Sequence, residues 1–102
     1  MQLYLMIGKD IHKFAKELWP INRSITGEGV RETLKKISFH LPKLKIKSVQ
    51  SGTKAFDWTV PQEWNVSKAY IITPEGKKIC DFSKNNLHLV GYSVPFEGVM
   101  KL

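Results

Sequence analysis

The spacing of the apolar residues changes after Pro42, and this change constrains the fold more than any other feature of the sequence. Upstream, apolar residues recur every three or four positions, which predicts two amphipathic helices. The first stripe contains Ile7, Ile11, Phe14, Ala15 and Leu18, and the second contains Val30, Leu34, Ile37 and Leu41. Pro20 and Pro42 end the two helices, because proline interrupts helical hydrogen bonding.

Downstream of Pro42, apolar and polar residues alternate, which predicts half-buried strands. We expect strands at residues 44–49 and 56–60, with a turn at residues 50–53 between them. Residues 68–82 predict a β-hairpin around a Pro-Glu-Gly turn, and residues 86–94 predict one more strand. The predicted fold class is therefore α+β, with two amino-terminal helices leading an antiparallel, hairpin-rich β region.

Charge gives a weak indication of a partner. The net charge is +7, but fourteen of the sixteen cationic residues are lysines scattered along the chain. Nucleic-acid binders favour arginine, whose guanidinium forks onto phosphate and guanine, so we do not expect a nucleic-acid partner. The densest candidate basic surface contains Lys35, Lys36, Lys43, Lys45 and Lys47.

Cysteine usage and the opening residues bear on the compartment. Cys80 is the one cysteine, so an intramolecular disulfide is excluded and a reducing compartment fits best. The apolar run within residues 1–10 is too short for a signal peptide or a membrane span. We therefore expect a cytoplasmic protein without a membrane association.

Histidines and the cysteine give no strong site. His12, His40 and His88 lack a second ligand at metal-site spacing, and His40 is better explained as a cation near a helix carboxyl terminus. A nucleophilic pair of Cys80 and His88 is conceivable across a hairpin. A core or half-buried thiol at Cys80 is the favoured interpretation, because no helix amino terminus lowers the thiol pKa there.

Carboxylates and glycines also allow two interpretations each. Asp57, Asp81 and Glu63 are candidates for paired acid and base groups, but the aspartates fall on the expected solvent faces of strands. Gly27 and Gly29 open the second helix, where backbone N–H groups are able to hold an anion. We favour the alternative that these glycines allow the chain to turn sharply.

Four ordered blocks of the sequence carry a resemblance to a known family. They are "LWPINRSITGEGVRETLKKI", "SGTKAFDWTVPQEWNVSKAYI", "GKKICDF" and "NNLHLVGYSVP". Together they resemble the amino-terminal part of a bacterial family of uncharacterised aminopeptidase-like proteins. Members are often associated with surface-polysaccharide gene clusters, and their main domain is similar to zinc aminopeptidases. The resemblance spans about residues 8–102.

The resemblance implies a division of the chain. Residues 1–53 are expected to begin the aminopeptidase-like domain, and residues 54–102 to begin an inserted β-rich domain of unknown function. In isolation we expect residues 1–102 to form a single compact unit. Residues 95–102, "PFEGVMKL", resemble a place where family members continue, so we expect an incomplete domain. Uncovered apolar edges would then favour self-association or association with the remainder of the peptidase.

The resemblance transfers no catalytic residue or metal ligand to this chain. Zinc is implied for full-length members, whose ligands and general base lie further along, near a histidine-proline stretch that this sequence lacks. Arg23, Ser24 and Thr26 match the family and are candidates for one wall of a substrate cleft, with Arg23 contacting an anion. We favour the competing explanation, that these three residues cap the second helix and satisfy its free N–H groups.

Two functions follow from these observations. The first, implied by the resemblance, is an amino-terminal fragment of a zinc-aminopeptidase-like hydrolase, which we expect to be inactive alone and whose full-length relatives are expected to hydrolyse peptide bonds. The alternative is a small basic module that binds an anionic partner or another subunit through its lysines.

Overall fold

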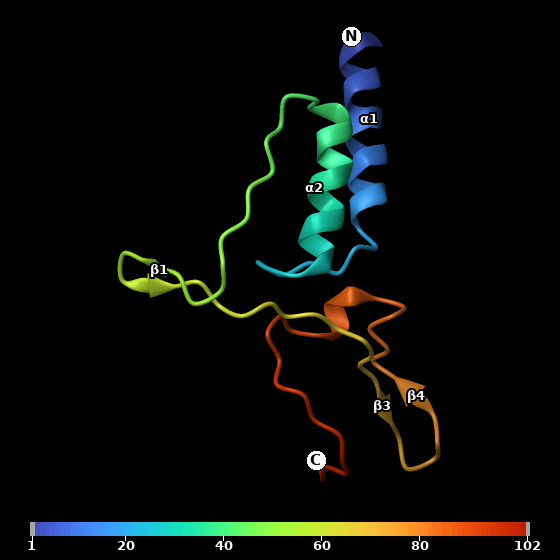
Figure 1. The fold of residues 1–102 in the computed structure, drawn as a ribbon. Helices are drawn as coiled ribbons and strands as arrows, with labels where there is room; N and C mark the ends of the chain where they lie inside the picture. Colours follow the sequence, from blue (N-terminus) through green and yellow to red (C-terminus); the bar gives the residue numbers. More distant parts are fainter. Residues whose placement is uncertain (1, 102) are drawn as a thin grey trace.

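Two antiparallel helices form the first half of the chain (Figure 1). The computed structural model describes the backbone of residues 2–101 and the side chains of residues 6–101. Helix α1 is Gln2–Leu18 and helix α2 is Glu28–His40. The Phe14 ring meets the His40 ring edge to face, with 4.6 Å between their centroids. Both helices predicted from the apolar spacing are confirmed.

Only part of the apolar stripe of α1 is covered. Phe14 and Leu18, near its carboxyl end, are half-buried. Ile7 and Ile11, nearer the amino end, expose 48% and 65% of their surface. The amphipathic pattern thus identified the helix correctly, but nothing within the described residues covers its first half.

The second half of the chain contains two short antiparallel hairpins. Strands β1 (Lys54–Ala55) and β2 (Trp58–Thr59) form the first hairpin, and β3 (Ile71–Ile72) and β4 (Lys78–Ile79) form the second. In the second hairpin Ile71 pairs with Ile79 and Ile72 with Lys78. The α+β class and the hairpin predicted at residues 68–82 are confirmed.

The other predicted strands are wrong in detail. Residues 44–49 are extended but pair with no strand among the described residues. The predicted turn is present, since the Thr53 N–H donates to the Gln50 carbonyl at 3.2 Å, but it leads into β1. Of residues 56–60, the first two form the tight turn of the first hairpin and only Trp58–Thr59 is a strand. Alternation indicates an extended chain but cannot supply the pairing partner that a strand requires.

Residues 86–94 form no strand. They begin with the 3₁₀ helix η1 (Asn86–His88), whose first turn is capped by the preceding side chain. The Oδ1 atom of Asn85 accepts a hydrogen bond from the Leu87 N–H at 3.0 Å. Asparagine side chains commonly compete with strand formation in this way, which explains the departure from the alternating pattern.

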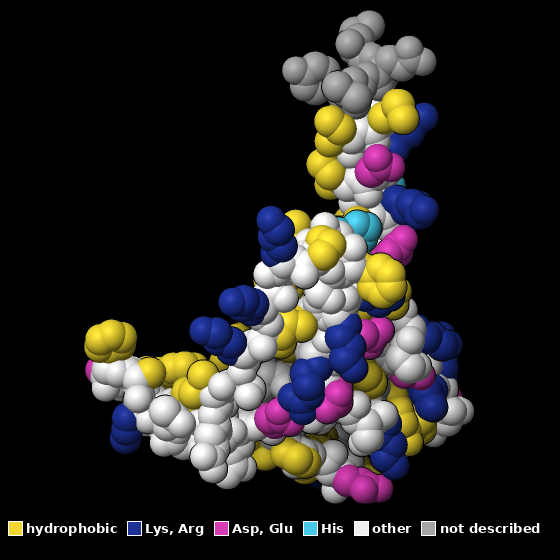
Figure 2. Space-filling view, turned by 45° about the horizontal axis from the view of Figure 1, so that its top comes forward, with side chains coloured by type: hydrophobic (Ala, Val, Ile, Leu, Met, Phe, Trp, Pro, Cys, Tyr) yellow, Lys and Arg dark blue, Asp and Glu magenta, His cyan; other side chains and the backbone are white. Residues whose placement is uncertain are grey.

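The chain buries little of its own apolar surface. Its radius of gyration is 18.4 Å, whereas a compact domain of this length has about 13 Å. Among the described side chains Ile21 is the one buried large hydrophobic residue, while Phe39 is 91% exposed and Val99 is 99% exposed. Figure 2 shows hydrophobic side chains spread over the surface of the upper helix and the projecting hairpin. No described helix has the length and apolar character that a membrane span needs. The division into domains at residue 53 stays a prediction.

Candidate binding cleft

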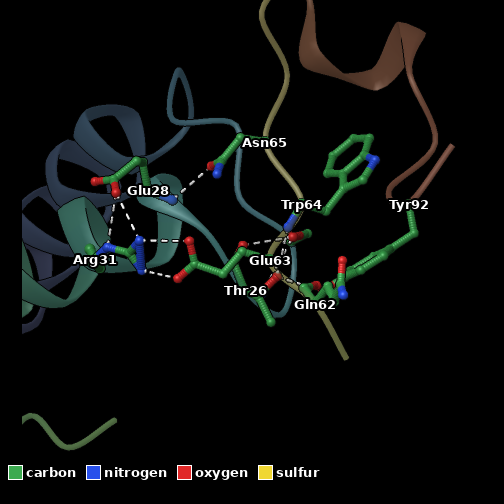
Figure 3. A network of polar contacts seen from close by, with 9 residues as sticks. Thr26, Glu28, Arg31, Gln62, Glu63, Trp64, Asn65 and Tyr92 are labelled. Carbon is green, nitrogen blue, oxygen red and sulfur yellow. Dashed lines mark hydrogen bonds and ion pairs between the residues drawn. The ribbon is translucent and has the colours of Figure 1, made fainter. Parts of the chain in front are cut away.

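The loop between α1 and α2, residues 19–27, is the point where distant parts of the chain meet. Within the loop, the Ile21 side chain is buried. The Nδ2 atom of Asn86 donates to the Trp19 carbonyl at 2.8 Å, which ties the loop to η1. Residues 62–66 contact the other end of the loop (Figure 3). The loop therefore joins the helical half to the hairpin-rich half.

Arg23 has a structural contact at the end of α1. Its Nη1 atom donates to the Leu18 carbonyl at 2.9 Å, which satisfies one of the free carbonyls at the helix carboxyl terminus. A cation is also favourable there, because the helix dipole is negative at that end. Arg23 does not line the cleft described below, and its predicted role as a contact for an anion stays untested.

The expected capping of α2 by loop residues is wrong. The helix begins after Gly27, and no side chain of the loop caps it. Instead the Glu28 N–H donates to the Oδ1 atom of Asn65 at 2.9 Å (Figure 3). Asn65 is 37 residues away, so no local pattern marked it as the cap.

Thr26 connects three segments through one hydroxyl group. Its Oγ1 atom accepts the Trp64 N–H at 3.2 Å and lies 2.5 Å from the Tyr92 hydroxyl. The Tyr92 hydroxyl donates its proton to the Gln62 carbonyl at 3.2 Å. The Thr26 hydroxyl must therefore be the donor to the Tyr92 oxygen, so each of the two hydroxyl groups donates one hydrogen bond and accepts another.

Trp64 is held on two sides. Its indole Nε1 donates to the Ser93 carbonyl at 3.1 Å. Its ring stacks on the Tyr92 ring with 5.8 Å between centroids and 22° between planes. A tryptophan fixed by both a hydrogen bond and a stacked neighbour loses little further entropy when it contacts a ligand.

The two glycines are explained by close approach of the backbone. Gly27 has φ 98° and ψ −173°, a region open to glycine alone. A Cβ atom on it would lie 2.6 Å from the Trp64 carbonyl oxygen, and one on Gly29 would lie 2.0 Å from the Asn22 carbonyl oxygen. The favoured interpretation, that these glycines allow a sharp turn, is confirmed for Gly27, whereas Gly29 lies within α2 and allows the close approach of Asn22.

An exposed ion-pair network spans the two halves. Arg31 pairs with Glu28 at 2.8 Å and bonds both carboxylate oxygens of Glu63, the Nη2 contact being 2.8 Å (Figure 3). The Arg31 and Glu63 side chains are 44% and 47% exposed. Exposed ion pairs contribute at most about 1 kcal/mol to stability, so the bidentate contact between Arg31 and Glu63 orients α2 and residues 62–66 more than it stabilises them. Glu63 is therefore engaged with a cation and not with a second carboxylate.

A cleft of about 650 Å³ opens beside the α1–α2 loop. Its apolar wall contains Trp19, Pro20, Ile21, Trp64, Val66 and Phe82. Its polar groups include Ser24 and Thr26, the asparagines Asn22, Asn65, Asn85 and Asn86, and the charged Glu17, Glu28, Glu32 and Lys84. Ser24 and Thr26 thus line this cleft together with residues that no local motif connected to them, and their predicted contact with a substrate stays a prediction.

The remaining candidates lie apart from the cleft. Cys80 is exposed and has φ 50°, so the prediction of a core or half-buried thiol is wrong. It follows β4 directly, where the chain turns away from the sheet. Asp57 lies exposed in the turn of the first hairpin. Within the described side chains, no three His, Cys, Asp or Glu residues gather closely enough to hold a metal ion.

Asp81 has a local partner in place of a catalytic one. Hydrogen bonds from the Ser83 hydroxyl, at 2.7 Å, and from the Ser83 N–H, at 3.0 Å, lower the pKa of its carboxyl group. The Lys78 ammonium, 4.0 Å away, acts in the same direction. This arrangement is a local turn in which the charged form is favoured.

The candidate basic surface is split between two kinds of backbone. Lys35 and Lys36 lie on α2, whereas Lys43, Lys45 and Lys47 lie on the extended segment that follows it. All are exposed except Lys36, which is half-buried. Whether this surface binds a partner stays a prediction.

Comparison with known proteins places the chain in a family. Residues 12–101 match the family described as domain of unknown function, DUF4910. A Clostridium acetobutylicum protein is 53% identical over 95 residues, which are 93% of this chain and 22% of that protein. Its provisional name is polysaccharide biosynthesis protein with aminopeptidase-like domain.

A solved structure agrees with this match. It is the crystal structure of a provisionally named peptidase from Clostridium acetobutylicum, with a TM-score of 0.83 and 53% identity. The match covers 89% of this chain and 21% of that one. This chain therefore spans about a fifth of the length of the relatives it matches, and corresponds to their amino-terminal part. From the family match over residues 12–101, the chain belongs to the DUF4910 family.

Proposed function

We propose that this chain forms the amino-terminal part of a zinc-aminopeptidase-like hydrolase and supplies one wall of its substrate cleft. The observation that carries the proposal is the agreement in fold, at a TM-score of 0.83, with about a fifth of a longer provisional peptidase. The aminopeptidase-like domain in the name of the matched relative supports the same activity. Ser24 and Thr26 face a cleft, which fits the proposed wall.

The metal-binding residues in this proposal belong to other parts of the longer protein. Peptide hydrolysis by this class relies on a metal ion that activates water and on a carboxylate base. The described residues contain no cluster of three His, Cys, Asp or Glu side chains that fits such an ion. The role left to this chain is to position and enclose a substrate.

Exposed apolar side chains support association with the remainder of the longer protein. Met6 and Ile11 on α1 are 60% and 65% exposed, and Phe39 and Leu41 at the end of α2 are 91% and 56% exposed. Large apolar patches on a surface commonly mark contacts with other protein segments. We propose that the rest of the peptidase covers these patches, because the matched relatives are more than four times longer than the region they share with this chain.

The test compares three purified proteins with a panel of dipeptides in the presence of Zn²⁺. They are the 102-residue chain, the Clostridium acetobutylicum protein, and a chimera in which this chain replaces the 95 matched residues of that protein. The proposal expects amino-acid release from the second and third proteins and none from the first. Zinc-dependent release by the 102-residue chain alone would contradict it, as would a folded chimera and relative that hydrolyse no peptide in the panel.

A further inference from the structure

We infer that the cleft beside the α1–α2 loop binds an uncharged saccharide unit. The inference relies on the proposed function only for treating the cleft as a substrate surface, and it does not require peptide hydrolysis. It rests on three properties of the cleft lining: aromatic surfaces, amide groups with unused hydrogen-bonding capacity, and an excess of carboxylates.

The aromatic wall combines one exposed tryptophan, Trp19, with a half-buried one, Trp64, whose ring is held in place. Trp19 lines the cleft and is 57% exposed, while its carbonyl is fixed by Asn86 and the next-but-one residue, Ile21, is buried. Trp64 is held by the Ser93 carbonyl and by stacking on Tyr92. Sugar rings present C–H groups on their faces, and the negative face of an aromatic ring attracts them. The exposed Trp19 indole, beside the fixed and half-buried Trp64 indole, suits such a ring.

Asn65 and Asn86 each engage only one end of the side-chain amide group, so one hydrogen-bond donor group and one acceptor remain available. Asn65 accepts the Glu28 N–H through Oδ1, so its side-chain NH₂ group remains available within the described residues. Asn86 donates through Nδ2 to Trp19, so its Oδ1 remains available there. A sugar hydroxyl donates one hydrogen bond and accepts others, so a mixed set of amide donors and acceptors matches it well.

The charge of the lining argues against an acidic ligand. Glu17, Glu28 and Glu32 contribute three negative charges, and Lys84 contributes one positive charge. Arg31 offsets part of this through Glu28, but Glu17 and Glu32 form no ion pair among the described side chains. This local excess contrasts with the net charge of +7 of the whole chain. A uronate or a phosphate would be repelled, whereas carboxylate oxygens accept hydrogen bonds from neutral hydroxyls.

The volume is consistent with a small ligand. The cleft of about 650 Å³ lies within the range of about 300–1,000 Å³ that is typical of ligand sites. Its polar groups surround an apolar wall, which is the usual arrangement in a site that fixes the orientation of a ligand.

The experiment is a titration of the ¹⁵N-labelled 102-residue chain with neutral tri-N-acetylchitotriose, followed through the three tryptophan indole N–H signals. Trp19 and Trp64 line the cleft, whereas Trp58 lies on β2 outside it and serves as an internal control. We expect saturable shifts at Trp19 and Trp64 and none at Trp58. Trp19→Ala is expected to weaken binding roughly tenfold, and Trp58→Ala to leave it unchanged.

Trigalacturonate and tetra-alanine are the comparison ligands. The inference is overturned if the neutral sugar causes no shift at the cleft, or if trigalacturonate binds equally well. A shift with tetra-alanine alone would contradict the saccharide assignment while supporting the proposed peptidase function. If the isolated chain gives no dispersed spectrum, the same ligands are titrated into the chimera and its Trp19→Ala and Trp58→Ala variants, with tryptophan fluorescence as the readout.

Discussion

Gly29→Ala tests the close approach of the α1–α2 loop to the start of α2. A Cβ atom at this position would lie 2.0 Å from the Asn22 carbonyl oxygen and 2.9 Å from the Arg23 Cα. Ordinary contacts of this kind are more than an ångström longer than the first distance, so the loop backbone must withdraw. Overpacking costs about 1–3 kcal/mol, and alanine returns about 1 kcal/mol through helix propensity. The 2.0 Å approach places the overpacking cost in the upper part of this range, at about 2–3 kcal/mol, so we expect a net loss of about 1–2 kcal/mol.

Alanine substitutions at two other glycines serve as controls for the change in stability of Gly29→Ala. Gly8 lies within α1 with no atom within 4 Å of its ideal Cβ, so Gly8→Ala should stabilise the chain by about 0.5–1 kcal/mol. Gly52 has φ 86° and equally open space, so Gly52→Ala carries the backbone strain alone, about 1–2 kcal/mol. The set distinguishes helix propensity, backbone strain and steric overlap.

The assay is urea unfolding followed by far-ultraviolet circular dichroism, on the isolated chain and on the chimera with the Clostridium protein. The Trp64 backbone N–H signal reports whether the loop still contacts residues 62–66, because this group donates to the Thr26 hydroxyl. Stability of Gly29→Ala equal to or above that of the parent chain, alongside the expected gain for Gly8→Ala, would refute the proposed close packing of Asn22 against the helix.

Three further predictions follow from the contacts around the hairpins and the helices. Asn65→Ala removes the acceptor of the Glu28 N–H and should weaken the start of α2 by about 1 kcal/mol, seen as faster amide exchange at Glu28; unchanged exchange would contradict the cap. The Asp81 carboxyl should titrate below 3.8, and Ser83→Ala should raise its pKa toward that value in an NMR titration. Because the pKa of Asp81 is lowered in the folded chain, the stabilisation is present above pH 3.8 and is lost as the pH falls through the folded pKa. An Asp81 titration midpoint that Ser83→Ala leaves unchanged would refute the Ser83 hydrogen bonds as the cause of the lowered pKa. If the lysine surface binds an anionic polymer such as heparin, the affinity should fall steeply with salt concentration and with replacement of Lys43, Lys45 and Lys47 by alanine. Absent or salt-insensitive binding would show that these lysines only face solvent.

Local patterns predicted the elements that depend on local contacts. The apolar stripes gave both helices, and the Pro-Glu-Gly turn gave the β3–β4 hairpin, because a helix and a tight turn are formed by residues close in sequence. The strand predicted at residues 44–49 failed, since a strand depends on a partner that alternation does not identify.

The candidate site was predictable only in part. Ser24 and Thr26 belonged to a motif, and they line the cleft. The groups that complete it come from far along the chain: Asn65 caps α2 across 37 residues, and Asn86 reaches the Trp19 carbonyl across 67. Gly27 was the one local sign of the Asn65 contact, because a Cβ atom at this position would meet Asn65 and Trp64.

We propose that this chain shapes a cleft of a longer metallohydrolase, whose metal-binding side chains lie elsewhere in that protein. The most direct measurement is the zinc content per chain, by inductively coupled plasma mass spectrometry, of the 102-residue chain and of the chimera after the same gel filtration. We predict zinc bound stoichiometrically to the chimera and none retained by the 102-residue chain. Stoichiometric zinc held by the 102-residue chain, or a folded chimera that binds none when zinc is supplied, would contradict the account.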